Sequence, residues 1–306
     1  MTALLLVFLA AAPDAGTPQT LPELRRLAKQ LEPEIASPWV KQWLMNVNEL
    51  KPVTPSTWFC SKDKKTCAEK NPGDFTERTI DDDFVYARIS DPLGYARVLE
   101  LIAETGFTPA GKKVLDFGYG NLGQLLMLAP LGVEAHGLEI DPLLPIAGKK
   151  VSPKKGRVVL HHGYFASDAQ VVKDVGGGYD LWLSKNTLKR GYVHPAEPPD
   201  AKAQIDLGLD DAKFLALVFS ELKPGGVFVI YNIAAPKPGP YKPMADGRSP
   251  FSKDALTAAG FEVLSFDADD SPKAKAMAAK LEWATDWPDV QETLVSTFTI
   301  ARRPKR

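Results

Sequence analysis

The sequence predicts an α/β protein whose main sheet is doubly wound and mostly parallel, preceded by a helical, loop-rich N-terminal extension. From residue 112 onward, short apolar segments of strand length alternate with segments of helical periodicity, which is the pattern of a parallel sheet covered by helices. The first of these strands leads into a glycine-rich turn and then directly into a helix, an arrangement typical of ligand-binding parallel sheets. With 44% hydrophobic and 25% charged residues, the chain has ordinary globular composition and can bury a large core.

The first residues carry a candidate signal peptide, residues 1–16. The uninterrupted apolar run from Ala3 to Ala12 is too short to span a bilayer as a helix, but it has the length of a signal-peptide apolar region. No Lys or Arg precedes the run and Pro13, a poor cleavage context, follows it, so a plain apolar tail is the alternative interpretation. We expect export to the periplasm or the exterior, with a cytoplasmic location as the alternative, and no membrane span elsewhere.

Residues 17–94 form the predicted extension, and residues 95–306 the predicted main domain. In the extension, leucines at three-and-four spacing and a second amphipathic segment predict helices, while a stretch rich in Pro, Gly and charge predicts a loop. Gly106 ends the helix that opens the main domain. The predicted elements are helices at 21–31 and 39–50, a loop at 51–83 and a helix at 95–104.

The main domain continues with strands rich in Val, Ile, Leu and Phe, separated by helices. Five strands are predicted at 113–117, 133–140, 157–161, 179–184 and 227–233, with helices at 122–131 and 209–221. Two further segments, 261–266 and 297–301, are expected to close the sheet. A Pro-rich loop at 235–250 is long for a compact domain and is either a binding lid or a surface excursion.

The turn after the first strand is the most informative segment. Gly118 and Gly120 permit a tight turn and close contact between a ligand and the backbone. Asn121 follows in the same turn, and the next helix directs its free N–H groups and its positive end at the same place. Glu139 ends the second strand, where a carboxylate can accept hydrogen bonds from both hydroxyls of a ribose. The segment therefore predicts a nucleoside-containing ligand.

Two cofactor classes share this glycine pattern, the nicotinamide dinucleotides and S-adenosylmethionine. Asp116 stands two residues before the first glycine, and a buried carboxylate there suits a cationic amino-acid ligand but repels a pyrophosphate. Residues 222–226, Leu-Lys-Pro-Gly-Gly, precede an apolar strand, and residues 258–263 read as a helix-to-strand step. With these landmarks, residues 95–303 resemble the class I S-adenosylmethionine-dependent methyltransferases.

The resemblance implies a Rossmann-like sheet of seven strands with an antiparallel last strand, and S-adenosylmethionine as cofactor. It implies that Asp116, Gly118 and Gly120 form the loop around the methionine part, and that Glu139 binds the ribose.

The chain departs from the family pattern at two places. Leu122 stands where the family usually has a third small residue, and Gly123 follows one position later. After the third strand, where the family often has an acid near the adenine, this chain has Gly163-Tyr164-Phe165. Tyr164 and Ile140 are therefore the candidates for packing against the adenine ring.

The segment after the fourth strand is the candidate acceptor side. Ser184 to Thr187 takes the place of the D/N-P-P-Y/F signature found in many amino- and nucleic-acid N-methyltransferases, which argues against methylation of nucleic-acid bases. Ser184 is a candidate cofactor contact, Lys185 and Asn186 are candidates to orient the acceptor, and His194 is a candidate general base.

Other interpretations of these polar residues stay open. Lys189 and Arg190 read as solvated side chains, and His194 reads more readily as a loop residue before Pro195, since a lone histidine is a weak signal. Tyr86, Arg88 and Tyr95 either cover the acceptor pocket or pack at an internal interface.

Charge and histidine placement limit the partners. The net charge is −1 and the basic runs are short, so no nucleic-acid footprint is expected. His161 and His162 are adjacent on a strand, so their side chains point to opposite faces and do not favour a metal site. The expected partner is a small-molecule or protein methyl acceptor.

The two cysteines, Cys60 and Cys67, are seven positions apart in a polar stretch. Two cysteines are too few for a structural zinc site. In an exported protein we expect a local disulfide between them, and in the cytosol two thiols.

The predicted function is methyl transfer from S-adenosylmethionine. The alternatives are an NAD(P)-dependent oxidoreductase, which shares the glycine turn, and a non-catalytic binding protein that has kept the fold.

Overall fold

The computed structural model describes residues 20–63, 65–88, 91–197, 204–236, 239 and 241–305. The predicted signal peptide lies outside this part of the chain. No helix among the described residues has the length and apolarity that a membrane crossing needs. The chain divides into two compact units. The N-terminal unit comprises the described residues up to Gly111 and Tyr119–Gly163, and the C-terminal unit comprises Lys112–Gly118 and Tyr164–Arg306.

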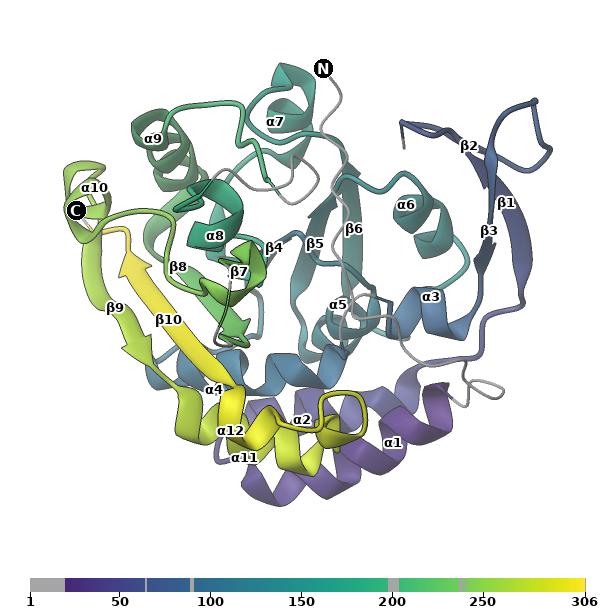
Figure 1. Ribbon diagram of the computed structural model, residues 1–306, viewed down its shortest axis with the longest axis horizontal. Helices are drawn as coiled ribbons and strands as arrows, with labels where there is room; N and C mark the ends of the chain where they lie inside the picture. The colour runs from purple at the N-terminus through teal and green to yellow at the C-terminus, as the bar shows by residue number, and fades with distance from the viewer. Residues whose placement is uncertain are drawn as a thin grey trace. The chain divides into compact units, whose positions relative to one another are not determined.

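The main sheet has seven strands in the order β6-β5-β4-β7-β8-β10-β9 (Figure 1). The strands are β4 Lys113–Phe117, β5 Glu134–Glu139, β6 Arg157–His162, β7 Tyr179–Lys185, β8 Leu222–Ala234, β9 Glu262–Asp269 and β10 Val295–Arg302. β7 pairs in parallel with β4 and β8, and β5 pairs in parallel with β6. β10 is antiparallel to both of its neighbours, β8 and β9. The doubly wound, mostly parallel sheet with an antiparallel last strand is confirmed.

The C-terminal unit packs its helices around an aromatic core. Trp182 of β7 makes edge-on ring contacts with Phe214 and Phe228. Asp210 starts the predicted helix 209–221 by accepting the N–H of Lys213. The helices of this unit are α7 Ala169–Val175, α8 Arg190–Val193, α9 Asp211–Glu221, α10 Lys253–Ala258, α11 Ser271–Lys280 and α12 Val290–Thr293. The sequence did not predict α11, because only a few small or flexible side chains of this lysine-rich segment are buried.

The N-terminal unit contains the two predicted helices of the extension. The leucines of α1 are buried as the spacing predicts. On α4, the Glu100 carboxylate accepts the N–H groups of Ala36 and Ser37, so it satisfies free donors at the start of α2. The helices of this unit are α1 Thr20–Leu31, α2 Pro38–Met45, α3 Asp82–Tyr86, α4 Ala96–Glu104, α5 Gly123–Leu128 and α6 Leu143–Gly148.

The prediction of a loop at 51–83 is wrong. This stretch forms a three-stranded antiparallel sheet in the order β2-β1-β3 (Figure 1). Its strands are β1 Ser56–Cys60, β2 Cys67–Ala68 and β3 Thr76–Ile80. The polar loop between the cysteines obscured the β-branched and aromatic residues Thr57, Trp58 and Phe59, which favour a strand.

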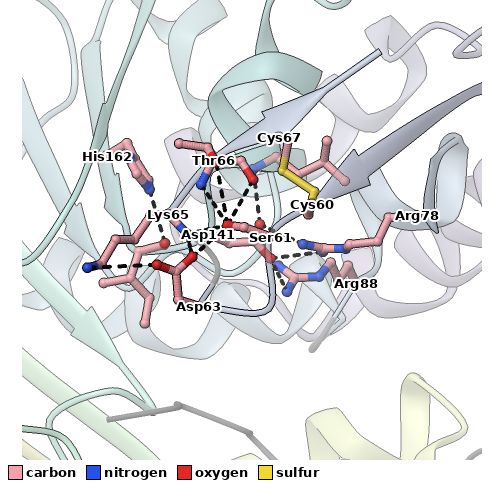
Figure 2. The surroundings of a disulfide bond; sticks show 12 residues. Cys60, Ser61, Asp63, Lys65, Thr66, Cys67, Arg78, Arg88, Asp141 and His162 are labelled. Atoms are coloured by element: carbon pink, nitrogen blue, oxygen red, sulfur yellow. Dashed lines mark hydrogen bonds and ion pairs between the residues drawn. A yellow bond between two sulfur atoms is a disulfide. The ribbon is translucent and has the colours of Figure 1, made fainter. Parts of the chain in front are cut away.

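A disulfide joins Cys60 to Cys67, as predicted (Figure 2). The two residues stand directly opposite each other in the β1–β2 register. Ser61 supports the short loop between them, because its hydroxyl donates to Asp63 and accepts the N–H of Thr66. The covalent bond therefore anchors a hairpin whose tip has no apolar side chain to hold it in place.

Candidate functional site

The predicted cofactor residues are divided between the two units. Gly120, Asn121, Glu139 and Ile140 belong to the N-terminal unit, and Asp116, Gly118, Tyr164 and Ser184 belong to the C-terminal unit.

Glu139, the last residue of β5, is held by backbone donors. Its Oε2 accepts the N–H of Gly120 at 3.2 Å, and its Oε1 accepts the N–H of Ile140 at 2.8 Å. Burial raises the pKa of the Glu139 carboxyl, while these N–H groups and the charge of Arg88 act in the opposite direction. Each carboxylate oxygen has a second lone pair, so this fixed carboxylate can still accept hydrogen bonds from a ligand.

Asn121 shapes the turn that follows Gly120. Its Oδ1 accepts the N–H of Gly123 at 3.0 Å, and its Nδ2 donates to the carbonyl of Arg88 at 3.3 Å. The side chain is fully buried, so these bonds make Asn121 a positioning residue for the glycine turn.

Asp141 lies two residues beyond Glu139 and binds two arginines (Figure 2). Arg78 of β3 makes a bidentate contact at 2.9 and 2.9 Å, and Arg88 donates to Oδ2 at 2.6 Å. Asp141 also accepts the N–H of Leu143 at the start of α6. Burial raises the pKa of the Asp141 carboxyl, but the arginines outweigh it and hold the pKa below its ordinary value. Each oxygen of Asp141 therefore accepts two hydrogen bonds. Each oxygen of Glu139 accepts one from the backbone, so Glu139 is the carboxylate that can still bind a ligand.

Gly118 is required by the geometry of the C-terminal unit. Its φ is +74°, and a Cβ there would lie 2.1 Å from Thr187 Oγ1. Thr187 also donates to the Gly118 carbonyl at 3.3 Å. The turn after β4 thus passes directly against the segment after β7. Asp116 precedes this turn as a buried residue of β4, opposite Leu183 of β7.

The segment after β7 is tied to the end of β8. Asn186 has a φ of +62°, a conformation in which Asn is several-fold enriched among non-glycine residues. Its Oδ1 accepts the N–H of Ile233 at 2.7 Å, and its own N–H donates to the Tyr231 carbonyl at 2.9 Å. Ser184 is buried and accepts the N–H of Leu188 at 3.0 Å. Asn186 and Ser184 therefore fix the backbone at this edge of the sheet.

Two lysines are buried beside these residues. Lys185 and Lys189 are each 5% exposed. Lys189 Nζ donates to the Ile233 carbonyl at 2.5 Å. Burial and the charge of Lys185 lower the pKa of Lys189 to about 7. The interpretation of Lys189 as solvated is wrong, because tertiary contact with β8 covers it, whereas Arg190 is exposed as expected.

The remaining candidates lie in different surroundings. His194 directly follows α8 with 46% of its side chain exposed, and its Nε2 bonds the Asp211 carboxylate at 2.8 Å. Tyr164 is 40% exposed. Tyr86 and Tyr95 are buried, and the Tyr86 hydroxyl donates to the Lys51 carbonyl, which favours packing over a role in covering a pocket. The described residues contain no group of three or more metal-ligating side chains.

Comparison with known proteins finds no matching family model and no matching curated protein. Solved structures do match. The [4+2]-cyclase SpnF is 18% identical, with 68% of this chain and 80% of that chain covered and a TM-score of 0.45. An S-adenosylmethionine-dependent methyltransferase from Mesorhizobium loti is 17% identical, with 69% and 98% covered and a TM-score of 0.43. Phosphoethanolamine N-methyltransferase 2 from Haemonchus contortus, in complex with S-adenosylmethionine, is 14% identical, with 69% and 53% covered and a TM-score of 0.41.

The fold follows from the chain's own topology. Counted in chain order, the strands of the main sheet run 3-2-1-4-5-7-6, and the seventh is antiparallel. A glycine turn follows the first strand and an acidic residue ends the second. With this strand order and these two landmarks, the chain has the Rossmann-like fold of the class I S-adenosylmethionine-dependent methyltransferases.

Proposed function

We propose that this chain binds S-adenosylmethionine and transfers its methyl group to an acceptor. The observation that carries the proposal is the position of β10, an antiparallel strand between β8 and β9. In the dinucleotide-binding sheet the sixth strand lies directly beside the fifth. The strand order therefore supports methyl transfer over the alternative of an NAD(P)-dependent oxidoreductase.

The residues present fit the cofactor. Glu139 offers a fixed carboxylate that suits the two ribose hydroxyls. Asp116 offers a buried carboxylate that suits a cationic amino group. Gly118 leaves no room for a side chain, so a ligand at that turn meets backbone. When bound, S-adenosylmethionine supplies a methyl group already activated by the sulfonium charge.

The protein's own contribution to such a reaction is alignment and exclusion of water. The backbone at the carboxyl ends of β7 and β8 is held by Ser184 and Asn186. Ligands of open α/β sheets bind at this edge. We therefore propose that the acceptor, a small molecule or a protein segment, binds beside Lys185 and Asn186.

Replacing Glu139 by alanine is expected to weaken binding of S-adenosylhomocysteine by about 1–3 kcal/mol, since hydrogen bonds from two hydroxyls to a charged acceptor are lost. This corresponds to a rise in Kd of roughly 5- to 150-fold. Isothermal titration calorimetry measures it, and Glu139→Gln separates the loss of charge from the loss of the side chain.

Asp141→Ala is the matched comparison. It removes the carboxylate that binds Arg78 and Arg88, so we expect a lower melting temperature and a smaller change in Kd than in Glu139→Ala. If Asp141→Ala instead weakens binding more than Glu139→Ala while the protein stays folded, the ribose is bound by Asp141 and the assignment of Glu139 is wrong.

We also propose that the chain works in an oxidising compartment. The disulfide between Cys60 and Cys67 supports this, because glutathione keeps such thiols reduced in the cytosol. Non-reducing mass spectrometry of protein isolated from its native cells should find the two cysteines joined and the N-terminus processed. Two freely alkylated thiols and an intact N-terminus would contradict the proposal.

A further inference from the structure

Lys189 is a buried lysine that forms no ion pair within the described part of the chain. Among the described residues, its Nζ makes one hydrogen bond, to the Ile233 carbonyl, and the Tyr192 ring centroid lies 5.5 Å from Nζ. A charged ammonium has three donors and is costly to bury without a partner. The position of Lys189 therefore favours the neutral amine.

Asn232 supplies a second, independent observation. It is 1% exposed, and its Nδ2 donates to the Leu188 carbonyl at 2.8 Å. This bond fixes the orientation of the amide, since only the NH₂ group can donate to a carbonyl. Its Oδ1 is buried and has no hydrogen-bond partner among the described residues. A buried acceptor left unsatisfied is destabilising, so a ligand donor there would be favourable.

The two groups belong to one place in the C-terminal unit. Lys189 follows Leu188, whose carbonyl binds Asn232, and Asn232 precedes Ile233, whose carbonyl binds Lys189. The two hydrogen bonds thus cross between the same two segments, which follow β7 and end β8. These are carboxyl ends of parallel strands, where ligands of open α/β sheets bind.

We propose that Lys189 and Asn232 form the acceptor site for a nucleophile that carries an N–H or O–H group, with Lys189 as the general base. The inference rests on the proposed function. Asn232 Oδ1 accepts a hydrogen bond from the acceptor. The acceptor atom gains a bond to the methyl carbon as the bond from that carbon to sulfur breaks. The electron pair of the broken bond stays on sulfur, and the acceptor's proton moves to Lys189 Nζ.

The electrostatic surroundings agree with this role. Burial lowers the pKa of Lys189 to about 7, assisted by the charge of Lys185. Burial also raises the pKa of the Tyr192 hydroxyl, which keeps that neighbour uncharged. On the neighbouring loop, Asp246 pairs with Arg248 and Arg190. A base whose pKa lies near neutral pH is best suited to accept a proton in the transition state.

Trace acetylation of the full chain with acetic anhydride from pH 6 to pH 10, read by mass spectrometry for each lysine, tests the proposal. The control is Lys213, which is exposed and whose pKa is raised by Asp210. At pH 7 we expect Lys189 to react roughly ten times faster than Lys213 or more, because a far larger fraction of it is neutral. The proposal would be overturned if the acetylation rate of Lys189 reached half of its maximum only near pH 10, or if Lys189 were not acetylated at any pH.

Lys189→Met distinguishes a base from a structural lysine. We expect the variant to melt at a higher temperature than the wild type at pH 6, where burial of the ammonium is costly, and to bind S-adenosylmethionine within twofold of the wild type. A lower melting temperature would show that Lys189 holds the segment in place and would overturn the role of base. Acetylation needs no cofactor, so failure of the wild type to bind S-adenosylmethionine would refute the proposed function separately.

Discussion

Replacing Gly118 by alanine is expected to destabilise the protein by about 3 kcal/mol and to abolish measurable cofactor binding. An alanine at its φ of +74° carries the cost of a left-handed conformation, roughly 1–2 kcal/mol. Its Cβ would also lie 2.1 Å from Oγ1 and 2.8 Å from Cβ of Thr187, and such overpacking costs about 1–3 kcal/mol. Thr187 is β-branched and stiff, so relief requires movement of the turn. Urea unfolding and calorimetry with S-adenosylhomocysteine measure the two effects.

Gly111 provides the matched control. Its φ is +71°, but nothing lies within 4 Å of the position its Cβ would take. Gly111→Ala therefore isolates the backbone cost, about 1 kcal/mol. Adding Thr187→Gly to Gly118→Ala removes the steric clash. We therefore expect the double variant to regain the stability by which Gly118→Ala falls below Gly111→Ala. Equal losses in Gly118→Ala and Gly111→Ala would show that close packing at Gly118 does not matter.

The Glu221→Gln variant is expected to gain stability relative to the wild type as the pH rises. Glu221 ends α9 and accepts the Trp182 indole N–H at 3.1 Å, while its Oε1 is buried without a partner among the described residues. Burial raises the pKa of the Glu221 carboxyl from 4.5 to about 8. Ionisation therefore favours the unfolded chain between these two values, and wild-type stability falls over that range. The full difference is on the order of 5 kcal/mol.

Urea unfolding of both proteins at intervals from pH 4.5 to pH 9 measures this effect. The quantity to compare is the difference in unfolding free energy between variant and wild type. Other titrating groups, such as Lys189, contribute equally to both proteins, so their contributions cancel in this difference. Glu262→Gln, at an exposed residue of β9, is the control and should show little pH dependence. A difference for Glu221→Gln that stays constant across the range would contradict a buried, protonated Glu221.

The strands and the cofactor turn were predictable because local patterns encode them. The apolar runs that became β4, β5 and β7 match their predicted bounds within about one residue. The glycine turn and Glu139 were predictable because a tight turn and a strand-end carboxylate each require particular residue types at a fixed spacing. The structure adds that Asp141 is occupied by two arginines, a distinction that required knowledge of where Arg78 and Arg88 lie.

The features that were missed depend on contacts between segments distant in sequence. Lys189 is buried where it bonds β8, and Glu221 is buried where it accepts the Trp182 indole N–H. No local periodicity reveals either burial, since charged residues in such positions are usually solvated.

The small sheet of β1–β3 was missed because its strands are short and two polar loops separate them. The β-branched and aromatic residues Thr57, Trp58 and Phe59 were the signal in the sequence that could have indicated it.

Titration of the wild-type protein with S-adenosylmethionine and, separately, with NADH and NADPH tests the central claim most directly. The position of the antiparallel strand β10 and the fixed carboxylate of Glu139 predict saturable binding of S-adenosylmethionine and of S-adenosylhomocysteine. No heat of binding is expected for NADH or NADPH. Saturable binding of NADH with no response to S-adenosylmethionine would contradict the assignment.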